Sequence, residues 1–290
     1  MNIKNLLNPI HLYEHRRGYV QALKSSPGDI DRYIALRTIN TRKLKALKDK
    51  YRGERCFILG NGPSLKKHDL RLLIDEYAFV TNWFVLNDGF QELKKCFYCV
   101  CDPHFWNYGE GFHQELVDKL RGNPDATKFF EYAAYPSYKS LRPRLKNIFF
   151  IKLEGKSKVW EGHFSTDIWK STCWGKTVII ELCLPIAFYL GFSIVYLLGC
   201  DCDYKLDAND DFENSFFYDI SQVPHRDIEH VQKHADEPRY NLPFWEASYS
   251  VVKQFFERNG RKIFNAGKGG KLEVFKRVDY DSLFPETSQK

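Results

Sequence analysis

The chain has 290 residues and a formal net charge of +6, and 43% of its residues are hydrophobic, 16% aromatic and 28% charged. This length and composition exclude a short disulfide scaffold and a disordered chain. They are typical of one large α/β domain with appendages or of two small domains. Residues 1–55 hold 13 Lys or Arg and 5 Asp or Glu, a balance of +8 that leaves the rest of the chain at −2. Because nucleic-acid readers carry basic residues on the binding domain itself, we expect no nucleic-acid partner.

The basic residues belong to a predicted helical N-terminal arm, residues 1–54. Its first 28 residues mix apolar and basic side chains, which is compatible with a segment lying on an anionic membrane surface or, as we favour, with an arm packed on its own domain. Residues 29–51 are predicted to be helical, with Asp29 and Asp31 at the start and six basic residues between positions 37 and 50.

From Arg55 onward, apolar β-type runs alternate with helical patterns. The predicted strands are residues 56–59, 78–81, 96–101, 147–151, 194–198 and 262–264. The predicted helices are residues 65–75, 111–120, 177–190 and 242–259. This alternation predicts an α/β fold: a Rossmann-like, mostly parallel sheet with helices on both faces, in a catalytic domain over residues 55–290. The polar, aromatic stretch at about 203–241 is predicted to form a lid-like insertion over a site.

The longest apolar stretch, residues 177–200, contains Glu181, Pro185 and Gly191, so it predicts a buried helix and a strand rather than a membrane span. No cleavable signal peptide is recognisable, so we expect a cytoplasmic protein, with peripheral contact to the inner membrane face as a further option through the arm. The eight cysteines are expected to be buried free thiols in a reducing compartment. Cys96 and Cys99 form a CxxC spacing, but an extended strand points them to opposite faces, so no metal site is predicted.

The sharpest local motif is Gly60-Asn61-Gly62-Pro63-Ser64, directly after the first predicted strand. The glycines allow close backbone approach, Pro63 suits a first helical position, and a following helix would aim unpaired N–H groups at the turn. The loop is therefore a candidate binding site for an anion such as a phosphate group. A tight turn without a ligand is the alternative, since the motif is neither a Walker A loop nor a GxGxxG fingerprint.

Polar side chains also end the other predicted strands. Asn82 and Asp102 end the second and third strands, and Gly199-Cys-Asp201-Cys-Asp203 ends the strand at 194–198. Each could be a turn-former, but together, at the edge where parallel sheets bind ligands, they favour contacts to ribose hydroxyls or a base edge.

A second glycine-bearing turn carries Trp174, Gly175, Lys176 and Thr177. It is predicted either to grip a phosphate or donor sugar, or only to start the helix that follows. A third loop, residues 265–270, offers glycines and a lysine at the same sheet edge. Exposed rings such as Trp83, Trp106 and Trp174 would provide stacking surfaces for a sugar.

For proton transfer, histidine is the side chain that titrates near neutrality. His225, His230 and His234 lie in the predicted lid, and His104 follows Asp102 and Pro103. No Ser-His-Asp order and no HExxH metal motif is present.

These motifs resemble the MptE-like / Maf-like domain of bacterial and archaeal glycosyltransferases, which is related to the glycosyltransferase family 42 sialyltransferases. The resemblance covers roughly residues 51–284. It is carried by residues 55–65, 81–84, 101–103 and 191–201, with 265–277 as a C-terminal signature.

The resemblance implies an inverting, metal-independent glycosyltransferase that moves a sialic acid, Kdo or another nonulosonic-type acid from a CMP-activated donor to a surface glycan or glycolipid. No cofactor is implied. Gly60 to Ser64, Asn82 and Asp102 would contact the nucleotide and donor. The chain departs from the family where the catalytic histidine would precede the last long helix, so His234 or His225 is the substitute base, with Tyr204 near the departing phosphate.

Two alternatives stay open. One is an MptE-like 6-hydroxymethylpterin pyrophosphokinase, which would use ATP and Mg²⁺ and would need Asp102, Asp201 and Asp203 to converge on the ion. The other is a non-catalytic nucleotide-binding or scaffold protein, favoured by the missing family histidine. A homo-oligomer is compatible with any of the three.

Overall fold

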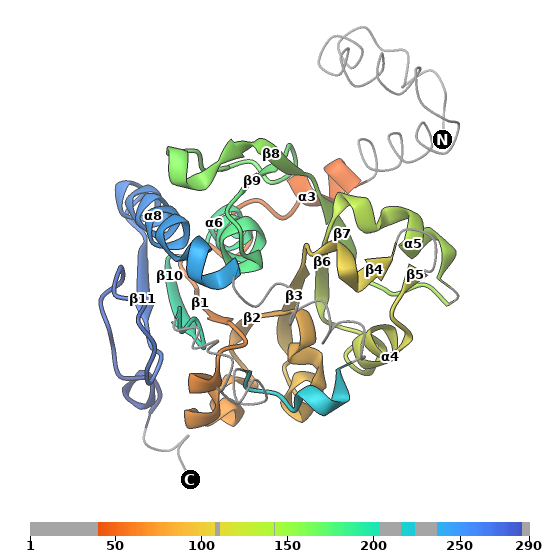
Figure 1. The fold of residues 1–290 in the computed structure, drawn as a ribbon, viewed down its shortest axis with the longest axis horizontal. Coiled ribbons are helices and arrows are strands. Elements are labelled where there is room, and N and C mark those ends of the chain that lie inside the picture. Colours follow the sequence, from red (N-terminus) through yellow and green to blue (C-terminus); the bar gives the residue numbers. More distant parts are fainter. Residues whose placement is uncertain (1–39, 108–110, 142, 203–215, 224–236, 286–290) are drawn as a thin grey trace, which may run out of the picture.

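A computed structural model describes residues 40–107, 111–141, 143–202, 216–223 and 237–285 (Figure 1). The predictions for residues 1–39 of the arm and for most of the lid lie outside these residues.

The centre of the molecule is a seven-stranded sheet in the order β11-β10-β1-β2-β3-β6-β7, with every neighbouring pair parallel. The strands are β1 (Arg55–Leu59), β2 (Tyr77–Thr81), β3 (Lys95–Val100), β6 (Thr127–Glu131), β7 (Ile148–Ile151), β10 (Ile194–Leu198) and β11 (Lys262–Asn265). The predicted α/β, Rossmann-like fold class is confirmed. The chain runs from β1 outward to β7 and then returns to β10 beside β1, so the switch of direction lies between β1 and β10.

The strand β6 is not among the predicted strands. In β6 the two central phenylalanines are flanked by Lys128 and Glu131, which shortens the apolar run. Lys128 is nevertheless fully buried, and its ammonium donates to the carbonyls of Asn123, Pro124 and Ala126. A charge satisfied by backbone carbonyls can occupy an interior position that its residue type argues against.

Two small two-stranded sheets lie outside the main one. β4 (Trp106–Asn107) pairs antiparallel with β5 (Gly111–Phe112), and β8 (Leu153–Lys158) pairs parallel with β9 (Thr172–Trp174).

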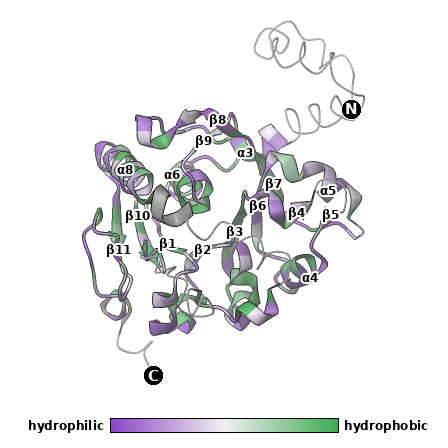
Figure 2. Cartoon of the chain, in the orientation of Figure 1, coloured by the Kyte–Doolittle hydropathy of each residue, from purple (hydrophilic) through white to green (hydrophobic). Residues whose placement is uncertain are grey.

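Alternating side chains of the strands build two hydrophobic cores, one on each face of the sheet. Phe57, Val80 and Tyr98 belong to one core, and their neighbours Ile58, Phe79 and Cys99 belong to the other. The first core includes residues of α4 (Gln114–Gly122) and of the C-terminal segment, and short 3₁₀ segments also contribute to it. The second includes residues of α6 (Leu184–Leu190) and α8 (Glu237–Arg258). Figure 2 shows hydrophobic and hydrophilic colour side by side on α8, as expected for a helix with one buried face.

The predicted helix over 65–75 is wrong. The chain instead forms two 3₁₀ segments, Pro63–Lys67 and Leu70–Leu73, because His68 is extended and the Asp69 carboxylate accepts from Arg71 N at 3.1 Å. A local side-chain contact of this kind competes with continuous helix.

The other helices agree in position. The region 177–190 begins with one π-helical segment, Ile179–Cys183, before α6, and Pro185 there has no N–H to donate. The predicted helix over 111–120 starts later, at Gln114, since 111–112 form β5, and a short α5 (Tyr135–Ser140) follows β6.

The described end of the arm packs on the domain. α3 (Thr41–Lys45) ends well before the predicted position 51, because Asp49 has a φ of 55° and its N–H donates to Tyr189 O at 2.9 Å. Tyr51 N donates to Leu190 O at 2.8 Å, and Leu44 is buried in the second core. These contacts attach the segment from residue 40 onward to α6.

All eight cysteines are free, as predicted; six are buried as expected, and Cys101 and Cys200 are half-buried. Cys96 lies in the first core and Cys99 in the second, which confirms the opposite faces expected of an extended CxxC. Within the described ranges, no helix combines the length and the apolar character needed to cross a bilayer.

Candidate functional site

Three loops meet at the carboxyl ends of β1, β10 and β11. A Cβ atom on Gly60 would lie 2.4 Å from Gly199 O, and one on Gly62 would lie 2.5 Å from Asp201 Oδ2. Gly270, with a φ of +74°, is equally close to the backbone of Asp201, at 2.5 Å from its carbonyl oxygen. The glycines are therefore required here for close loop-to-loop approach.

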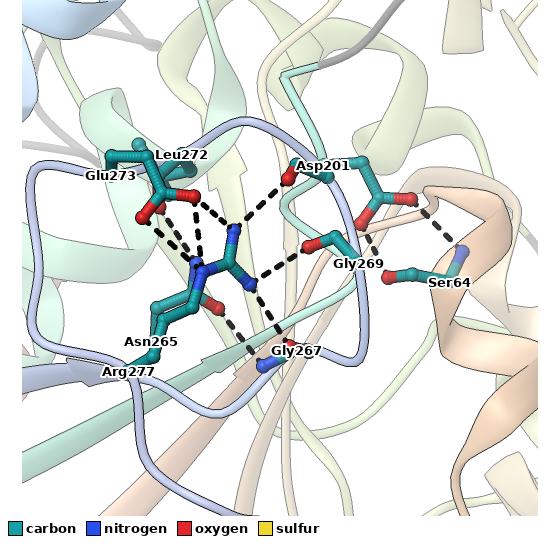
Figure 3. A network of polar contacts seen from close by, with 9 residues as sticks. Ser64, Asp201, Asn265, Gly267, Gly269, Leu272, Glu273 and Arg277 are labelled. Carbon is teal, nitrogen blue, oxygen red and sulfur yellow. Dashed lines mark hydrogen bonds and ion pairs between the residues drawn. The ribbon is translucent and has the colours of Figure 1, made fainter.

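The first loop is tied to the second through its own N–H groups. Gly60 N donates to Leu198 O at 2.8 Å and Gly62 N donates to Gly199 O at 2.9 Å. Ser64 N donates to Asp201 Oδ2 at 2.9 Å, and Ser64 Oγ donates to Asp201 Oδ1 (Figure 3). The prediction that these N–H groups are unpaired and available to an anion is therefore wrong for Gly60, Gly62 and Ser64.

The third loop is held by two side chains. Asn265 accepts from Gly267 N at 2.9 Å and donates to Leu272 O at 2.8 Å. The Arg277 guanidinium donates to the carbonyls of Gly267, Gly269 and Gly270 at 3.0 to 3.1 Å and pairs with Glu273 (Figure 3). These bonds hold the glycine-rich loop beside Ser64 and Asp201.

Two asparagines at neighbouring strand ends have an unusual feature. Asn61 donates its Nδ2 hydrogen to Thr81 O at 3.2 Å, and Tyr98 OH donates to the backbone carbonyl of Asn82 at 3.1 Å. The side-chain oxygens Asn61 Oδ1 and Asn82 Oδ1 are both buried, and neither has a hydrogen-bond partner among the described residues. Asn82 also has a φ of 51°, a left-handed conformation that asparagine tolerates better than most residues.

A histidine and a carboxylate lie together at the end of β3. Asp102 caps the short turn Pro103–Phe105, and its Oδ1 lies 2.7 Å from His104 Nδ1. Trp83, which follows Asn82, packs on Phe105 with ring centroids 5.3 Å apart, so this pair adjoins the end of β2.

The second glycine-bearing turn is organised by a buried carboxylate. Glu181 Oε1 accepts from Gly175 N at 3.0 Å and from Lys176 N at 2.7 Å, and Cys101 Sγ donates to Oε2 at 3.1 Å. Burial raises the pKa of the Glu181 carboxyl, while these three hydrogen bonds lower it. Thr177 Oγ1 accepts from Ile180 N at 3.3 Å. The turn thus starts the helix, and its Gly175 and Lys176 N–H groups serve Glu181 rather than a phosphate.

The predicted stacking rings divide into two groups. Trp83 and Trp106 are buried in the first core, so the expectation that they line an open cleft is wrong. Trp174 is 36% exposed and lies beside Trp160, whose ring also contacts Phe244.

Four of the predicted site residues, Asp203, Tyr204, His225 and His234, lie outside the described residues. The described middle of the predicted lid, residues 216–223, lies against the candidate site. Phe217 N donates to Asn61 O at 3.1 Å, and the Phe217 ring stacks on Phe84 with centroids 5.0 Å apart. Phe217 carried no sequence signal that would separate it from any other aromatic residue of that stretch.

The carboxylates needed for a magnesium site are not gathered in the described part of the chain, where no group of three or more His, Cys, Asp or Glu side chains could hold a metal ion. Asp201, one of the three candidates, is turned to Ser64.

No family model matches the chain, and no curated protein matches it. Among solved structures it is similar to the sialyltransferase CstII from Campylobacter jejuni, determined in complex with the substrate analogue cytidine-5′-monophosphate. The identity is 16% and the TM-score 0.45, and the match covers 78% of this chain and 85% of that one. This is a distant likeness of fold, and the MptE-like / Maf-like assignment stays a prediction.

Proposed function

We propose that the protein binds a nucleotide across the carboxyl ends of β1 and β2 and acts as a glycosyltransferase with a CMP-activated donor. The observation that carries the proposal is the pair of buried acceptors, Asn61 Oδ1 and Asn82 Oδ1. A buried polar group without a partner costs about 1–3 kcal/mol, so two at adjacent strand ends indicate a ligand that brings hydrogen-bond donors. Ribose hydroxyls and the cytosine amino group are such donors.

The engaged backbone of the first loop favours a nucleotide with little phosphate. A triphosphate site of the P-loop kind needs several free N–H groups and a lysine, whereas Gly60, Gly62 and Ser64 already donate within the protein. A CMP-linked sugar carries one phosphate, and its recognition depends on the nucleoside. The paired N–H groups of the first loop are the physical reason to rank a CMP-linked sugar above ATP. The motif resemblance adds a nonulosonic-type acid as the expected sugar.

Among the described residues, we assign the acceptance of the acceptor's proton to His104, which lies at the end of β3 with Asp102 beside its Nδ1. In this scheme the acceptor O–H bond breaks and its proton passes to His104 Nε2. The oxygen forms a bond to the anomeric carbon of the donor, and the bond from that carbon to the phosphate oxygen breaks, which releases CMP. Contacts such as that of Asp102 commonly tighten only when substrate is bound.

The first test is a thermal-shift titration of the full chain with CMP, CDP, UDP, GDP and ATP, each with and without Mg²⁺. A ligand that binds only the folded state raises the melting temperature, and we expect CMP to do so equally with and without the metal. Asn61→Ala should reduce this shift at little change in stability, because it removes one unpaired oxygen together with one hydrogen bond. Asn259→Ala, at the exposed end of α8, is the matched control.

Other outcomes would redirect the assignment. Stabilisation by ATP only with Mg²⁺ would favour the pyrophosphokinase, and no response to any nucleotide would favour a scaffold protein. CMP stabilisation that Asn61→Ala leaves intact would contradict the placement of the site.

The base is tested by CMP release from CMP–N-acetylneuraminate and CMP–Kdo. His104→Gln should lower kcat by about 10²-fold or more, as removal of a general base does, with CMP affinity unchanged. His225→Gln and His234→Gln test the sequence-based alternatives, and the exposed His163→Gln is the control. If one of the lid variants alone loses turnover, that histidine is the base and the role of His104 is refuted.

A further inference from the structure

The glycine-rich loop after β11, residues 267–270, has no part in the proposed function so far. The carbonyls of its three glycines all accept from the Arg277 guanidinium, at 3.0 to 3.1 Å. A peptide unit is planar and trans, so its N–H points in the opposite direction to its C=O. The N–H groups that follow these three carbonyls, those of Lys268, Gly270 and Lys271, therefore point away from Arg277.

Lys271 N shows which part of the molecule lies on that side of the loop. It donates to Asp201 O at 2.6 Å, so these N–H groups are turned towards the loop after β10. Lys268 N and Gly270 N, in contrast, donate to no acceptor within the described part of the chain. N–H groups of nearby peptides that point to one side form the kind of concavity that binds an anion.

The Arg277 guanidinium strengthens these donors from the other side of the loop. A positive charge that binds a carbonyl oxygen polarises the peptide unit and makes its N–H a better donor. Arg277 itself pairs with Glu273 at 2.7 Å, and Lys268 Nζ pairs with Asp281. We therefore count neither of these two side chains as a direct contact to an anion.

Lys67 brings a positive charge to the same place. A Cβ atom on Gly269 would lie 3.6 Å from Lys67 Nζ and 3.7 Å from Ser64 Cβ, so the ammonium lies against the loop on its Ser64 side. Lys67 is exposed, and in the described ranges its Nζ makes neither an ion pair nor a hydrogen bond. Asp201, the acidic residue next to Ser64, is engaged by Ser64 N and Oγ. The Lys67 ammonium is therefore open to an anion at the loop.

The loop after β11 lies close to the proposed nucleotide. Figure 3 shows Gly269 between the Arg277 guanidinium and Ser64. Ser64 follows Asn61 in the same turn, and Asn61 Oδ1 is one of the two buried acceptors assigned to the nucleoside. Because β11, β10 and β1 are consecutive strands, the loop after β11 is about 10 Å from the end of β1, a distance that one nucleotide spans.

We infer that Lys268 N, Gly270 N and Lys67 Nζ bind the phosphate group of the CMP-linked donor. They supply three hydrogen-bond donors to the phosphate oxygens, and such charge-assisted bonds are stronger than neutral ones. When the bond from the anomeric carbon to the phosphate oxygen breaks, the phosphate gains negative charge, which the same donors stabilise. The inference rests on the proposed function, since it names the phosphate contacts of the same donor.

The first test is calorimetry of the full chain with CMP and with cytidine, which has the same nucleoside and no phosphate. We expect the wild type to bind CMP about tenfold more tightly than cytidine, or better. Lys67→Met should weaken CMP binding about tenfold and leave cytidine binding unchanged, and Lys67→Arg should retain most of the CMP affinity. Lys48→Met removes an exposed charge on the described end of the arm and is the matched control, which should change neither affinity.

The second test follows the two N–H groups themselves. In amide NMR spectra of the isotope-labelled full chain, the Lys268 and Gly270 amide protons should move downfield on addition of CMP. They should stay in place with cytidine, because only CMP brings a phosphate oxygen that accepts from them. The amide of Gly155, which lies on β8, is the control and should move with neither compound.

The outcomes separate this inference from the proposed function. An unchanged CMP affinity in Lys67→Met, or Lys268 and Gly270 amide protons that CMP does not move, would overturn the inference, while CMP binding by the wild type would still support the proposed function. If inorganic phosphate moves the two amide protons and CMP does not, the loop binds another anion and the inference is equally overturned. A wild type that binds neither CMP nor cytidine would refute the proposed function and the inference with it.

Discussion

Asp201 has an internal role that its position at a strand end did not reveal. Its carboxylate accepts from both the N–H and the hydroxyl of Ser64, so it joins the loop after β10 to the loop after β1. Sequence position predicted the edge of the sheet correctly. The residue at that edge contacts another loop, so its direct contact with a donor remains only a prediction.

Asp201→Asn should destabilise the protein by about 1–3 kcal/mol, because two charge-assisted hydrogen bonds to Ser64 become weaker neutral ones. Urea unfolding measures this. Asp219→Asn is the matched control, since Asp219 makes the same pair of bonds to Ser221 N and Oγ on an exposed turn, where the loss should be well under 1 kcal/mol. Equal losses in the two variants would contradict a special role for the loop junction.

Because of Lys128, the free energy of unfolding should depend on pH in the alkaline range. Burial lowers its pKa to about 8, whereas the unfolded chain titrates near 10.5. Between these values the unfolded state binds more protons, so stability rises with pH. Below about pH 8 both states are protonated, and the full penalty for burying the charge is present.

Lys128→Met removes this titration but leaves three carbonyls without a donor. We therefore expect a less stable protein at every pH, with the difference from wild type growing by up to about 3 kcal/mol between pH 8 and 10. Chemical denaturation at both pH values measures it. A difference that stays constant with pH would show that the Lys128 ammonium is not desolvated.

At the scale of elements, the loop after β11 depends on Arg277. One guanidinium binds three carbonyls of that loop, which a lysine ammonium cannot reproduce because its donors do not form a planar fork (Figure 3). Arg277 lies ten residues beyond Gly267 in sequence and reaches it only because the chain turns back, with Asn265 bridged to Arg277.

Arg277→Lys should speed hydrogen exchange of residues 266–271 by tenfold or more while global stability falls by about 1 kcal/mol, since the loss is local. Exchange followed by mass spectrometry checks this. Arg258→Lys, at an exposed site on α8 with a single long contact to Gln254, is the control and should leave the loop unchanged. Uniform acceleration across the sheet would contradict a local clamp.

At the scale of the molecule, the two parts of the sheet join where β1 pairs with β10. Here Gly60 and Gly199 touch through their backbones, and the candidate site lies beside this junction. A side chain at Gly60 would meet the carbonyl of Gly199, a backbone atom that can yield only if both loops move.

Gly60→Ala should therefore destabilise the whole domain by about 2 kcal/mol or more, as overpacking against rigid backbone does. Gly155→Ala is the control, because a Cβ there meets nothing within 4 Å, and it should be neutral or slightly stabilising. Thermal unfolding of both variants measures the contrast. A Gly60→Ala protein as stable as wild type would show that the junction is not tightly packed.

The sequence by itself determined the fold class and the sheet edge at which the candidate site lies. Six of the seven strands of the main sheet are apolar runs of the expected length, and parallel strands place Asn61, Asn82 and Asp102 at one edge by topology alone. The periodicity of apolar residues and the residue types found in turns are local properties, so they can be recognised from neighbouring residues.

Only the tertiary structure decided which polar groups are already paired. Ser64 N donates to the Asp201 carboxylate rather than to a bound anion, and Asp201 lies more than 130 positions away in sequence. Lys176 N donates to Glu181 of a buried helix rather than to a phosphate. The same holds for the ring contacts of Trp160 with Trp174 and with Phe244, which join three separate elements. Hydrogen bonds and ring contacts between distant segments exist only once the sheet has brought them together, and no local pattern encodes them.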